Sequence, residues 1–220
     1  MSAPNGQVVS KNRVAEHGEV YTAAREVNAM LDLVAQETER IDSRFLEPAC
    51  GNGNFLAEVL RRKLAVVASR YRTSQLEYER YAILALSSMY GIDILKDNVE
   101  GCRARLLGIL VDEHERLFAA AASGEFSTAA AYILSRNIVH GDALTLHTVG
   151  RHPQPIILPE WSPVNGSMLK RRDFSYGGLL QHEGFKELPM WSDIGDDAFI
   201  ARPVKDYPVI HFLRVADADQ

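Results

Sequence analysis

Residues 46–55 read LEPACGNGNF, and this stretch decides how the rest of the sequence is interpreted. It begins at the end of a short apolar run, passes through a turn with Gly51 and Gly53, and leads into a segment with helical spacing. Glycine adopts positive φ and lets the backbone approach a ligand closely, while the first turn of a helix offers unpaired N–H groups. In a parallel sheet, ligands bind outside the carboxyl ends of the strands. The stretch therefore predicts a ligand-binding loop between a strand and a helix.

The residues in and around this loop indicate what kind of ligand it holds. A dinucleotide fingerprint is incomplete because Leu56 stands at the third glycine position, and the Lys-Ser/Thr pair of a phosphate-binding loop is missing. Glu47 would repel a phosphate, but its carboxylate can accept charge-assisted hydrogen bonds from an ammonium group. The sequence therefore favours a ligand that carries an amino group.

Two further acidic residues end the next strand-like runs. Asp93 is expected to accept hydrogen bonds from ribose hydroxyls, as an acidic residue at a strand end does in nucleotide-binding folds. Asp142 is expected to accept a hydrogen bond from the exocyclic amine of adenine. The alternative is that both carboxylates only cap the helices that follow them. Together with the glycine loop, they favour a ligand that combines a nucleoside with an amino group.

Strand-like and helical stretches alternate along the chain. Helical spacing occurs on either side of the glycine loop and again between the later strand-like runs. The strand-like runs occupy residues 44–48, 90–94, 137–144, 155–161 and 207–215. Alternation of this kind is typical of right-handed βαβ units. The sequence predicts an α/β fold with a mostly parallel sheet and flanking helices.

The chain divides into three parts by composition. Residues 1–15 are small and polar and are expected to form a mobile lead-in. Residues 16–160 carry the alternating pattern and are expected to form the ligand-binding domain. Residues 161–220 are rich in Gly, Ser, Asp and Pro, which predicts a loop-rich extension that ends in a closing strand.

Composition limits the kinds of protein that the chain can be. With 220 residues, 46% hydrophobic and 24% charged, it has the content of a globular domain with a sizeable core. The net charge of −5 argues against a surface that is basic throughout. No stretch reads as a signal peptide or a membrane span, so a cytoplasmic location is expected. Cys50 and Cys102 are too few for a disulfide framework and are expected to be reduced thiols.

Four segments resemble the successive amino-terminal motifs of bacterial N6-adenine DNA methyltransferases of restriction-modification type. They read HGEVYTAAREVNAML at 17–31, FLEPACGNGNFL at 45–56, LSSMYGIDILKDNVEGCRARL at 86–106 and NIVHGDALTL at 137–146. The similarity spans residues 16–147. By this resemblance the fold is the Rossmann-like fold of S-adenosylmethionine-dependent methyltransferases. The resemblance also implies S-adenosylmethionine as the cofactor and adenine in DNA as the substrate.

The resemblance assigns cofactor contacts residue by residue. Tyr21 and Thr22 would lie along the methionine part of S-adenosylmethionine. The ribose and the adenine would be contacted by Asp93, Ile94, Asp142 and Ala143. The remaining expected contacts belong to the loop around the amino acid part of the cofactor, namely Glu47, Pro48, Ala49, Gly51, Asn52, Gly53, Asn54 and Phe55.

The resemblance fails at the catalytic motif of the family, which is Asn or Asp, then Pro-Pro, then an aromatic residue after the fourth strand. No such tetrapeptide occurs in this chain. The nearest segment in position is WSPVN at 161–165, in which Ser162, Pro163 and Asn165 would form a diverged catalytic loop. A chance match explains this segment at least as well. Because little sequence follows the fourth strand, the fold is expected to be truncated or diverged at its carboxyl end.

Candidate substrate contacts lie in the same region. Trp161 could stack on a base, although a Trp beside a strand end is more often a core or rim residue. Lys170, Arg171 and Arg172 could contact phosphates, and the alternative is a solvated loop of mixed charge. The His and Cys residues do not have the arrangement of a metal site, so no metal is expected.

Two hypotheses about function follow from these observations. The first is an S-adenosylmethionine-dependent DNA methyltransferase that methylates adenine at N6 through the diverged loop, in a restriction-modification setting. The alternative is a cofactor-binding subunit that needs a partner chain for catalysis and DNA recognition. Methyl transfer to another acceptor is a third hypothesis, because a fold does not fix its substrate. The oligomeric state and the target sequence stay open.

Overall fold

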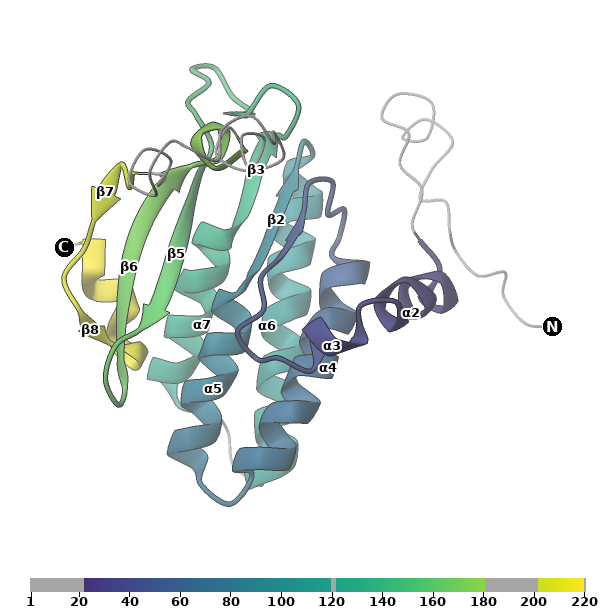
Figure 1. The fold of residues 1–220 in the computed structure, drawn as a ribbon, viewed down its shortest axis with the longest axis vertical. Helices are drawn as coiled ribbons and strands as arrows, with labels where there is room; N and C mark the ends of the chain where they lie inside the picture. The colour runs from purple at the N-terminus through teal and green to yellow at the C-terminus, as the bar shows by residue number, and fades with distance from the viewer. Residues whose placement is uncertain (1–21, 120–121, 181–201, 220) are drawn as a thin grey trace, which may run out of the picture.

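The computed structural model describes residues 22–119, 122–180 and 202–219 (Figure 1). The predicted lead-in and Tyr21 lie outside the described residues. The helices are α2 (Ala24–Asp32), α3 (Ala35–Thr38), α4 (Asn54–Tyr71), α5 (Gln75–Ser87), α6 (Lys96–Phe118), α7 (Gly124–Asn137) and the 3-10 helix η3 (Phe212–Asp219). The strands are β1 (Phe45–Glu47), β2 (Met89–Asp93), β3 (Ile138–Asp142), β4 (His147–Thr148), β5 (Ile157–Pro163), β6 (Met168–Ser175), β7 (Lys205–Asp206) and β8 (Ile210–His211).

Strands β1, β2 and β3 form the parallel part of a four-stranded sheet with the order β1-β2-β3-β4. Phe45 pairs with Met89 and Gly91 with Ile138, both in parallel register, and β4 returns antiparallel to β3. Helices α4 and α5 connect β1 to β2, and α6 and α7 connect β2 to β3. An α/β fold with parallel strands and flanking helices is therefore confirmed. The carboxyl ends of the three parallel strands share one edge of the sheet.

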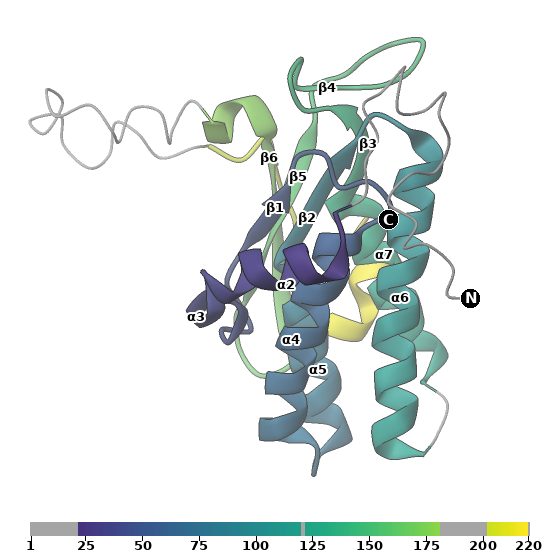
Figure 2. The same cartoon turned by 90° about the vertical axis from the view of Figure 1, so that its right-hand side faces the viewer.

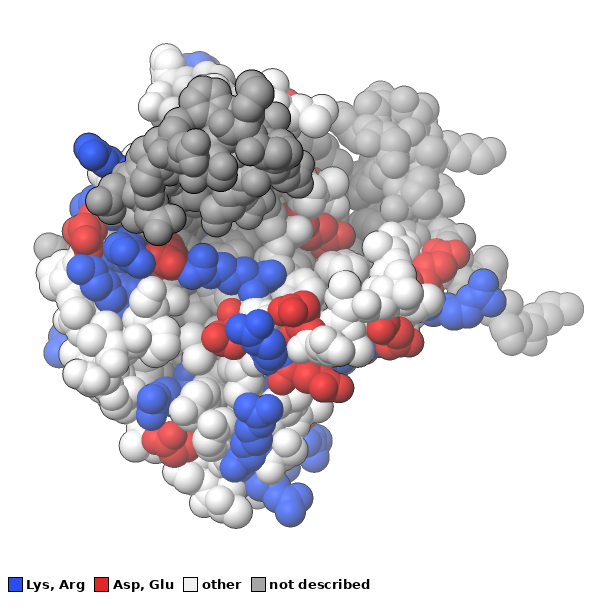
Figure 3. Space-filling model, in the orientation of Figure 1, with Lys and Arg blue, Asp and Glu red and all other residues white. Residues whose placement is uncertain are grey.

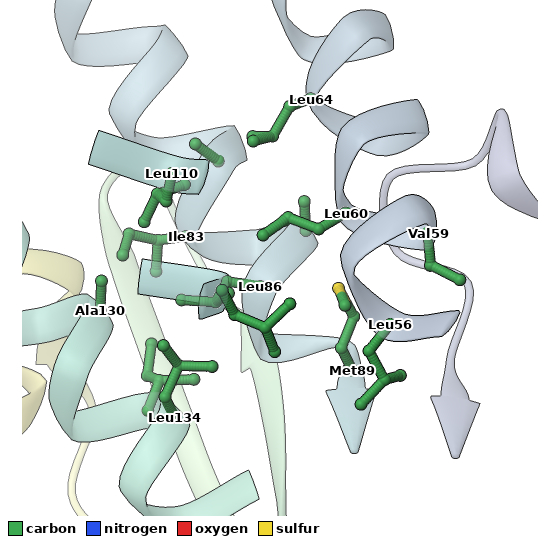
Figure 4. Packing of buried hydrophobic residues seen from close by; sticks show 14 of the residues in the cluster. Leu56, Val59, Leu60, Leu64, Ile83, Leu86, Met89, Leu110, Ala130 and Leu134 are labelled. Atoms are coloured by element: carbon green, nitrogen blue, oxygen red, sulfur yellow. The ribbon is translucent and has the colours of Figure 1, made fainter. Parts of the chain in front are cut away.

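The main core lies between the parallel sheet and helices α4 to α7. Side chains alternate between the faces of a strand, and on β2 Met89 joins the helical cluster whereas Tyr90 and Ile92 belong to a smaller second cluster. Figure 2 shows the four helices gathered on one side of the strands. Figure 4 shows Met89 beside side chains from these helices, among them Leu56, Leu60, Ile83, Leu86, Leu110 and Leu134.

A second, antiparallel sheet occupies part of the predicted loop-rich extension. β5 and β6 pair from Ile157 opposite Ser175 to Pro163 opposite Leu169, and β7 and β8 both pair with β6. Gly166 in the connecting turn has φ 53°, and it follows Asn165 in a dipeptide that favours tight hairpin turns. Over β6 and the last residues of β5, from Trp161 to Pro163, the prediction of a loop is wrong. The charged segment LKRRDF concealed the period-two alternation of a strand.

The predicted fourth strand exists as β5, but it does not extend the parallel sheet. Trp161 near its end donates its indole N–H to Asn137 Oδ1 at 2.9 Å. Because Asn137 immediately precedes β3, β5 ends at the amino-terminal edge of the parallel strands. Of the closing strand predicted over 207–215, only Ile210–His211 forms a strand, and residues 212–215 belong to η3. The predicted domain boundary after residue 160 falls inside β5.

Candidate functional site

The glycine loop joins β1 to α4 at the carboxyl edge of the parallel sheet. β1 ends at Glu47, and α4 begins at Asn54. Gly51 has φ 52° and Gly53 has φ 81°, a region in which other residues are strained. The Gly53 N–H donates to the Cys50 carbonyl at 2.8 Å and closes the turn. The loop therefore has the strand-turn-helix path that its sequence predicts.

Asp93 at the end of β2 fastens the loop to the sheet. One carboxylate oxygen accepts a hydrogen bond from the Gly51 N–H at 2.8 Å. The other accepts from the Leu95 N–H at 2.8 Å and from Asn98 Nδ2 at 3.2 Å. Asp93 is only 8% exposed. Both oxygens thus organise the protein itself, and contact with a ribose stays a prediction.

Close packing beneath the loop explains why glycine is needed at two positions. A Cβ at Gly53 would lie 2.6 Å from Cys102 Sγ on α6, and a Cβ at Gly91 would lie 2.9 Å from Cys50 Sγ. Both cysteines are buried free thiols, as expected. Hydrogen bonding to Cys102 and burial raise the pKa of the Cys50 thiol. The two thiols therefore serve as packing groups that hold the loop against α6.

Glu47 has a carboxylate oxygen to which no described residue donates a hydrogen bond. Its Oε2 is buried and has no hydrogen-bond partner among the described residues, and neither has the buried Oδ1 of Asn52 in the same loop. Burial, and to a lesser extent the negative charge of Asp93, raises the pKa of Glu47 from 4.5 to about 8. An unpaired buried carboxyl is costly, so this arrangement suits a site that receives a cationic donor.

The other predicted contacts to the amino acid part of the cofactor lie in different surroundings. Thr22 and Asn54 line a small cleft of about 150 Å³ together with residues of α2 and α4. Pro48 and Ala49 are exposed, and Phe55 packs against the main core. The cleft lies between α2 and the first turns of α4, next to the end of the glycine loop.

The predicted adenine contacts lie at the ends of β2 and β3. Asp142 Oδ1 accepts from the Leu144 N–H at 2.9 Å and the Thr145 N–H at 3.4 Å, and the bond to Leu144 lowers the pKa of this carboxyl. Ile94 is 49% exposed, whereas Ala143 packs against the second apolar cluster. Asp142 therefore caps the turn that leads into β4, whereas the alternative interpretation expected it to cap a helix.

The predicted catalytic residues are not brought together with the glycine loop. Ser162 and Pro163 line a cleft of about 380 Å³ with Ile41 and Ser88, which precede β1 and β2. Asn165 lies in the turn beyond and is exposed. These residues occupy the amino-terminal edge of the parallel strands, opposite the carboxyl edge that carries the loop. β5 runs opposite to the parallel strands, so its end carries Ser162 and Pro163 to the edge away from the glycine loop. A diverged catalytic loop at these residues would therefore lie far from the proposed cofactor site.

The predicted substrate contacts are divided between the two faces of the second sheet. Arg171 is 5% exposed and donates to both carboxylate oxygens of Asp173, at 2.7 and 2.8 Å. Trp161 is 6% exposed with its indole N–H in use. The phosphate contact of Arg171 and the base stacking of Trp161 are therefore corrected to core roles. Lys170 and Arg172 lie on the opposite face and stay partly exposed.

Comparisons with known proteins assign no family to this fold. No protein-family model, no curated protein and no solved structure matches the chain. In residues 22–119, 122–180 and 202–219, no group of three or more His, Cys, Asp or Glu side chains could hold a metal ion. Within the same ranges, no helix is long and apolar enough to cross a membrane. The geometry of the glycine loop and the resemblance of its sequence are therefore the basis for a functional proposal.

Proposed function

We propose that this protein holds S-adenosylmethionine at the glycine loop for N6-methylation of adenine in DNA. In this proposal it is the cofactor-binding subunit of an enzyme whose catalytic residues come from a partner chain. The buried, unpaired Oε2 of Glu47 is the observation that carries the proposal. The choice of adenine in DNA comes from the sequence resemblance.

The chemistry of the loop fits the amino acid end of S-adenosylmethionine. An ammonium group beside Glu47 would satisfy the orphaned oxygen through a charge-assisted hydrogen bond and favour the ionised carboxylate. Gly51 and Gly53 leave the backbone open to a ligand, and Asn52 offers an additional unpaired acceptor. When bound, S-adenosylmethionine supplies an activated methyl group on a sulfonium sulfur.

A partner chain is proposed because, among the residues that the structure describes, neither the family's catalytic motif nor its nearest substitute lies beside the loop. The chain contains no Asn/Asp-Pro-Pro-aromatic tetrapeptide. Its nearest substitute, Ser162 to Asn165, lies at the opposite edge of the parallel strands. A methyl acceptor must be held within reach of the donor for transfer, so residues at the far edge cannot position it.

Isothermal titration calorimetry with S-adenosylmethionine tests the cofactor assignment. The key variant is Glu47→Gln, and Glu100→Gln on α6 is the matched control because Glu100 is 62% exposed and forms a surface ion pair with Lys96. We expect Glu47→Gln to weaken binding by about 10- to 100-fold, since a hydrogen bond to a charged group contributes about 1.5–3 kcal/mol. Binding that is equal in both variants, or absent from the wild type, would refute the site.

Methyl transfer from radiolabelled S-adenosylmethionine to unmethylated DNA tests the subunit assignment. We expect the purified chain alone to leave the DNA unlabelled, and cell extract from the source organism to restore label in N6-methyladenine. A strain lacking the gene provides the control extract. Label transferred by the chain alone would contradict the need for a partner while leaving the cofactor site intact.

A further inference from the structure

The outer face of the β5–β6 sheet carries basic side chains that play no part in the proposed cofactor site. On β6, Lys170 and Arg172 alternate with the buried Leu169, Arg171 and Asp173, so the two basic side chains share the outer face. These side chains are 37% and 40% exposed. Figure 3 shows Lys and Arg side chains in a row over the position that β5 and β6 occupy in Figure 1.

One carboxylate connects the basic side chains of β6 to Arg44, which precedes β1. Glu160 on β5 accepts from Arg44 Nη2 at 2.5 Å and from Arg172 Nη2 at 2.6 Å, one bond to each oxygen. A single negative charge therefore orients two guanidinium groups, and each keeps further N–H donors for a ligand. Lys170 is paired with Asp206 at 3.0 Å beside them.

The row of basic side chains formed by Lys170, Arg172 and Arg44 ends at the 380 Å³ cleft, because Arg44 is one of the residues that line it. Two tyrosines form part of its wall: the rings of Tyr71 and Tyr81 are stacked with centroids 4.0 Å apart and an interplanar angle of 4°. Arg70 stands beside them in the lining of the cleft. The cleft therefore combines an aromatic surface with positive charge, at a size suited to a small ring system.

Positive charge is in excess on this surface although the chain is acidic overall. Glu39, Asp42 and Arg40 also line the cleft, and Arg40 lies 3.9 Å from Asp42. The excess comes from the arginine pair around Glu160 and from Arg70, which forms no ion pair with any described residue. Lys205 does not contribute, because it lies opposite the buried Asp173 in the register of β6 and β7 and so shares the inner face of the sheet. In a chain with a net charge of −5, a local excess of cations indicates an anionic partner.

We propose that this surface binds a nucleic-acid strand, with Arg44, Arg172 and Lys170 contacting phosphates and the cleft receiving a base against Tyr71. Cations on a protein surface bind the phosphate backbone without regard to sequence. Aromatic rings accept unpaired bases by stacking, because every base has a π-face. The inference rests on the proposed function only for the choice of DNA as the nucleic acid.

Fluorescence anisotropy with a labelled single strand of DNA, and with the matching duplex, tests this surface. The variant Lys170→Gln with Arg172→Gln removes two charges while keeping polar side chains. Its matched control is Arg116→Gln with Arg214→Gln, which removes two exposed, ion-paired cations from α6 and η3. We expect only the first variant to lose affinity, by about tenfold. Its slope of log affinity against log salt should fall by about 1.4 for the single strand and about 1.8 for the duplex, since each phosphate contact contributes about 0.7 and about 0.9, respectively.

Tyr71→Ala separates the base contact from the phosphate contacts. We expect it to weaken binding of the single strand by about tenfold and to leave the duplex unaffected, because paired bases cannot stack on a protein ring. No DNA binding by the wild type, or equal losses in variant and control, would overturn the inference. Calorimetry with S-adenosylmethionine on the same variants keeps the two proposals apart: loss of DNA binding with intact cofactor binding concerns this surface alone.

Discussion

At the scale of single residues, Glu47 is placed where folding disfavours its charge. The carboxyl is buried beside Asp93, and its unpaired oxygen receives nothing from the described part of the chain. A group with these properties lowers stability in its ionised form, which is consistent with the proposed ligand site. Local rules broken at functional positions are expected when binding compensates for them.

Glu47→Gln should therefore stabilise the ligand-free protein in alkaline solution. The pKa of Glu47 is about 8 in the fold and ordinarily 4.5, so between these values the folded state binds more protons than the unfolded state. The wild type thus loses stability as pH rises through this window, whereas glutamine does not titrate. We expect the melting temperature of the variant to exceed that of the wild type by a few degrees above pH 8, since about 1 kcal/mol corresponds to about 2–4 °C.

Thermal melts of wild type, Glu47→Gln and Glu100→Gln from pH 5 to pH 9 measure this difference. Glu100 is an exposed partner of Lys96, and its substitution should change stability little at any pH. A difference between Glu47→Gln and wild type that stays constant across the pH range would show that Glu47 does not titrate in the proposed window.

At the scale of elements, the junction between the glycine loop and α4 depends on two kinds of close approach. Asp93 draws the Gly51 N–H toward β2, and Cys102 on α6 fills the space beside Gly53. The loop is therefore held from the strand side and from the helix side. Such support holds the loop in one conformation, as the proposed cofactor site requires.

Gly53→Ala should destabilise the protein, and Gly108→Ala should not. The φ of 81° at Gly53 is strained for alanine, and the new Cβ would meet Cys102 Sγ, for a combined cost of about 1–3 kcal/mol. Gly108 lies within α6 with nothing within 4 Å of an added Cβ, so alanine there should stabilise by about 0.5–1 kcal/mol. Urea denaturation measures the free energy of unfolding of both variants. A destabilised Gly108→Ala together with an unchanged Gly53→Ala would contradict the prediction.

At the scale of the whole molecule, a buried charged cluster joins the second sheet to the helices. Arg171 on β6 binds Asp173 through two hydrogen bonds and also donates to the hydroxyl of Tyr132 on α7 at 2.6 Å and to Asp219 of η3 at 3.0 Å. Tyr207 donates to Asp173 at 3.1 Å. Segments far apart in sequence thus meet at one guanidinium group.

Arg171→Met should be strongly destabilising, because it leaves the buried Asp173 without its cation. Breaking one half of a buried pair costs about 3–5 kcal/mol. Adding Asp173→Leu should recover part of the loss, since it removes the uncompensated charge. Arg214→Met, which removes an exposed arginine from η3, should change stability by less than about 0.5 kcal/mol. Chemical denaturation measures the free energy of unfolding of each variant. A double variant that is less stable than Arg171→Met would contradict this expectation.

Local sequence patterns were sufficient for the parallel half of this molecule. The strand, glycine turn and helix at 46–55, the acidic ends of the next strands and the helices between them depend on neighbours in sequence. Glycine conformations and helical periodicity are properties of short segments, so they can be read before the fold is known. The same patterns placed Glu47 and the glycines at a loop on the carboxyl edge of the sheet.

Tertiary structure alone decided the direction of β5, the inward position of Arg171 and the unpaired state of Glu47. Each depends on interactions between distant segments. Trp161 donates a hydrogen bond to Asn137, Arg171 pairs with Asp219, and Glu47 is buried near the charge of Asp93. A strand of given composition can run in either direction, and burial can hide a charge or leave it exposed. The sequence by itself determined where the glycine loop lies, and the fold determined that the predicted catalytic segment lies at the opposite edge of the parallel strands.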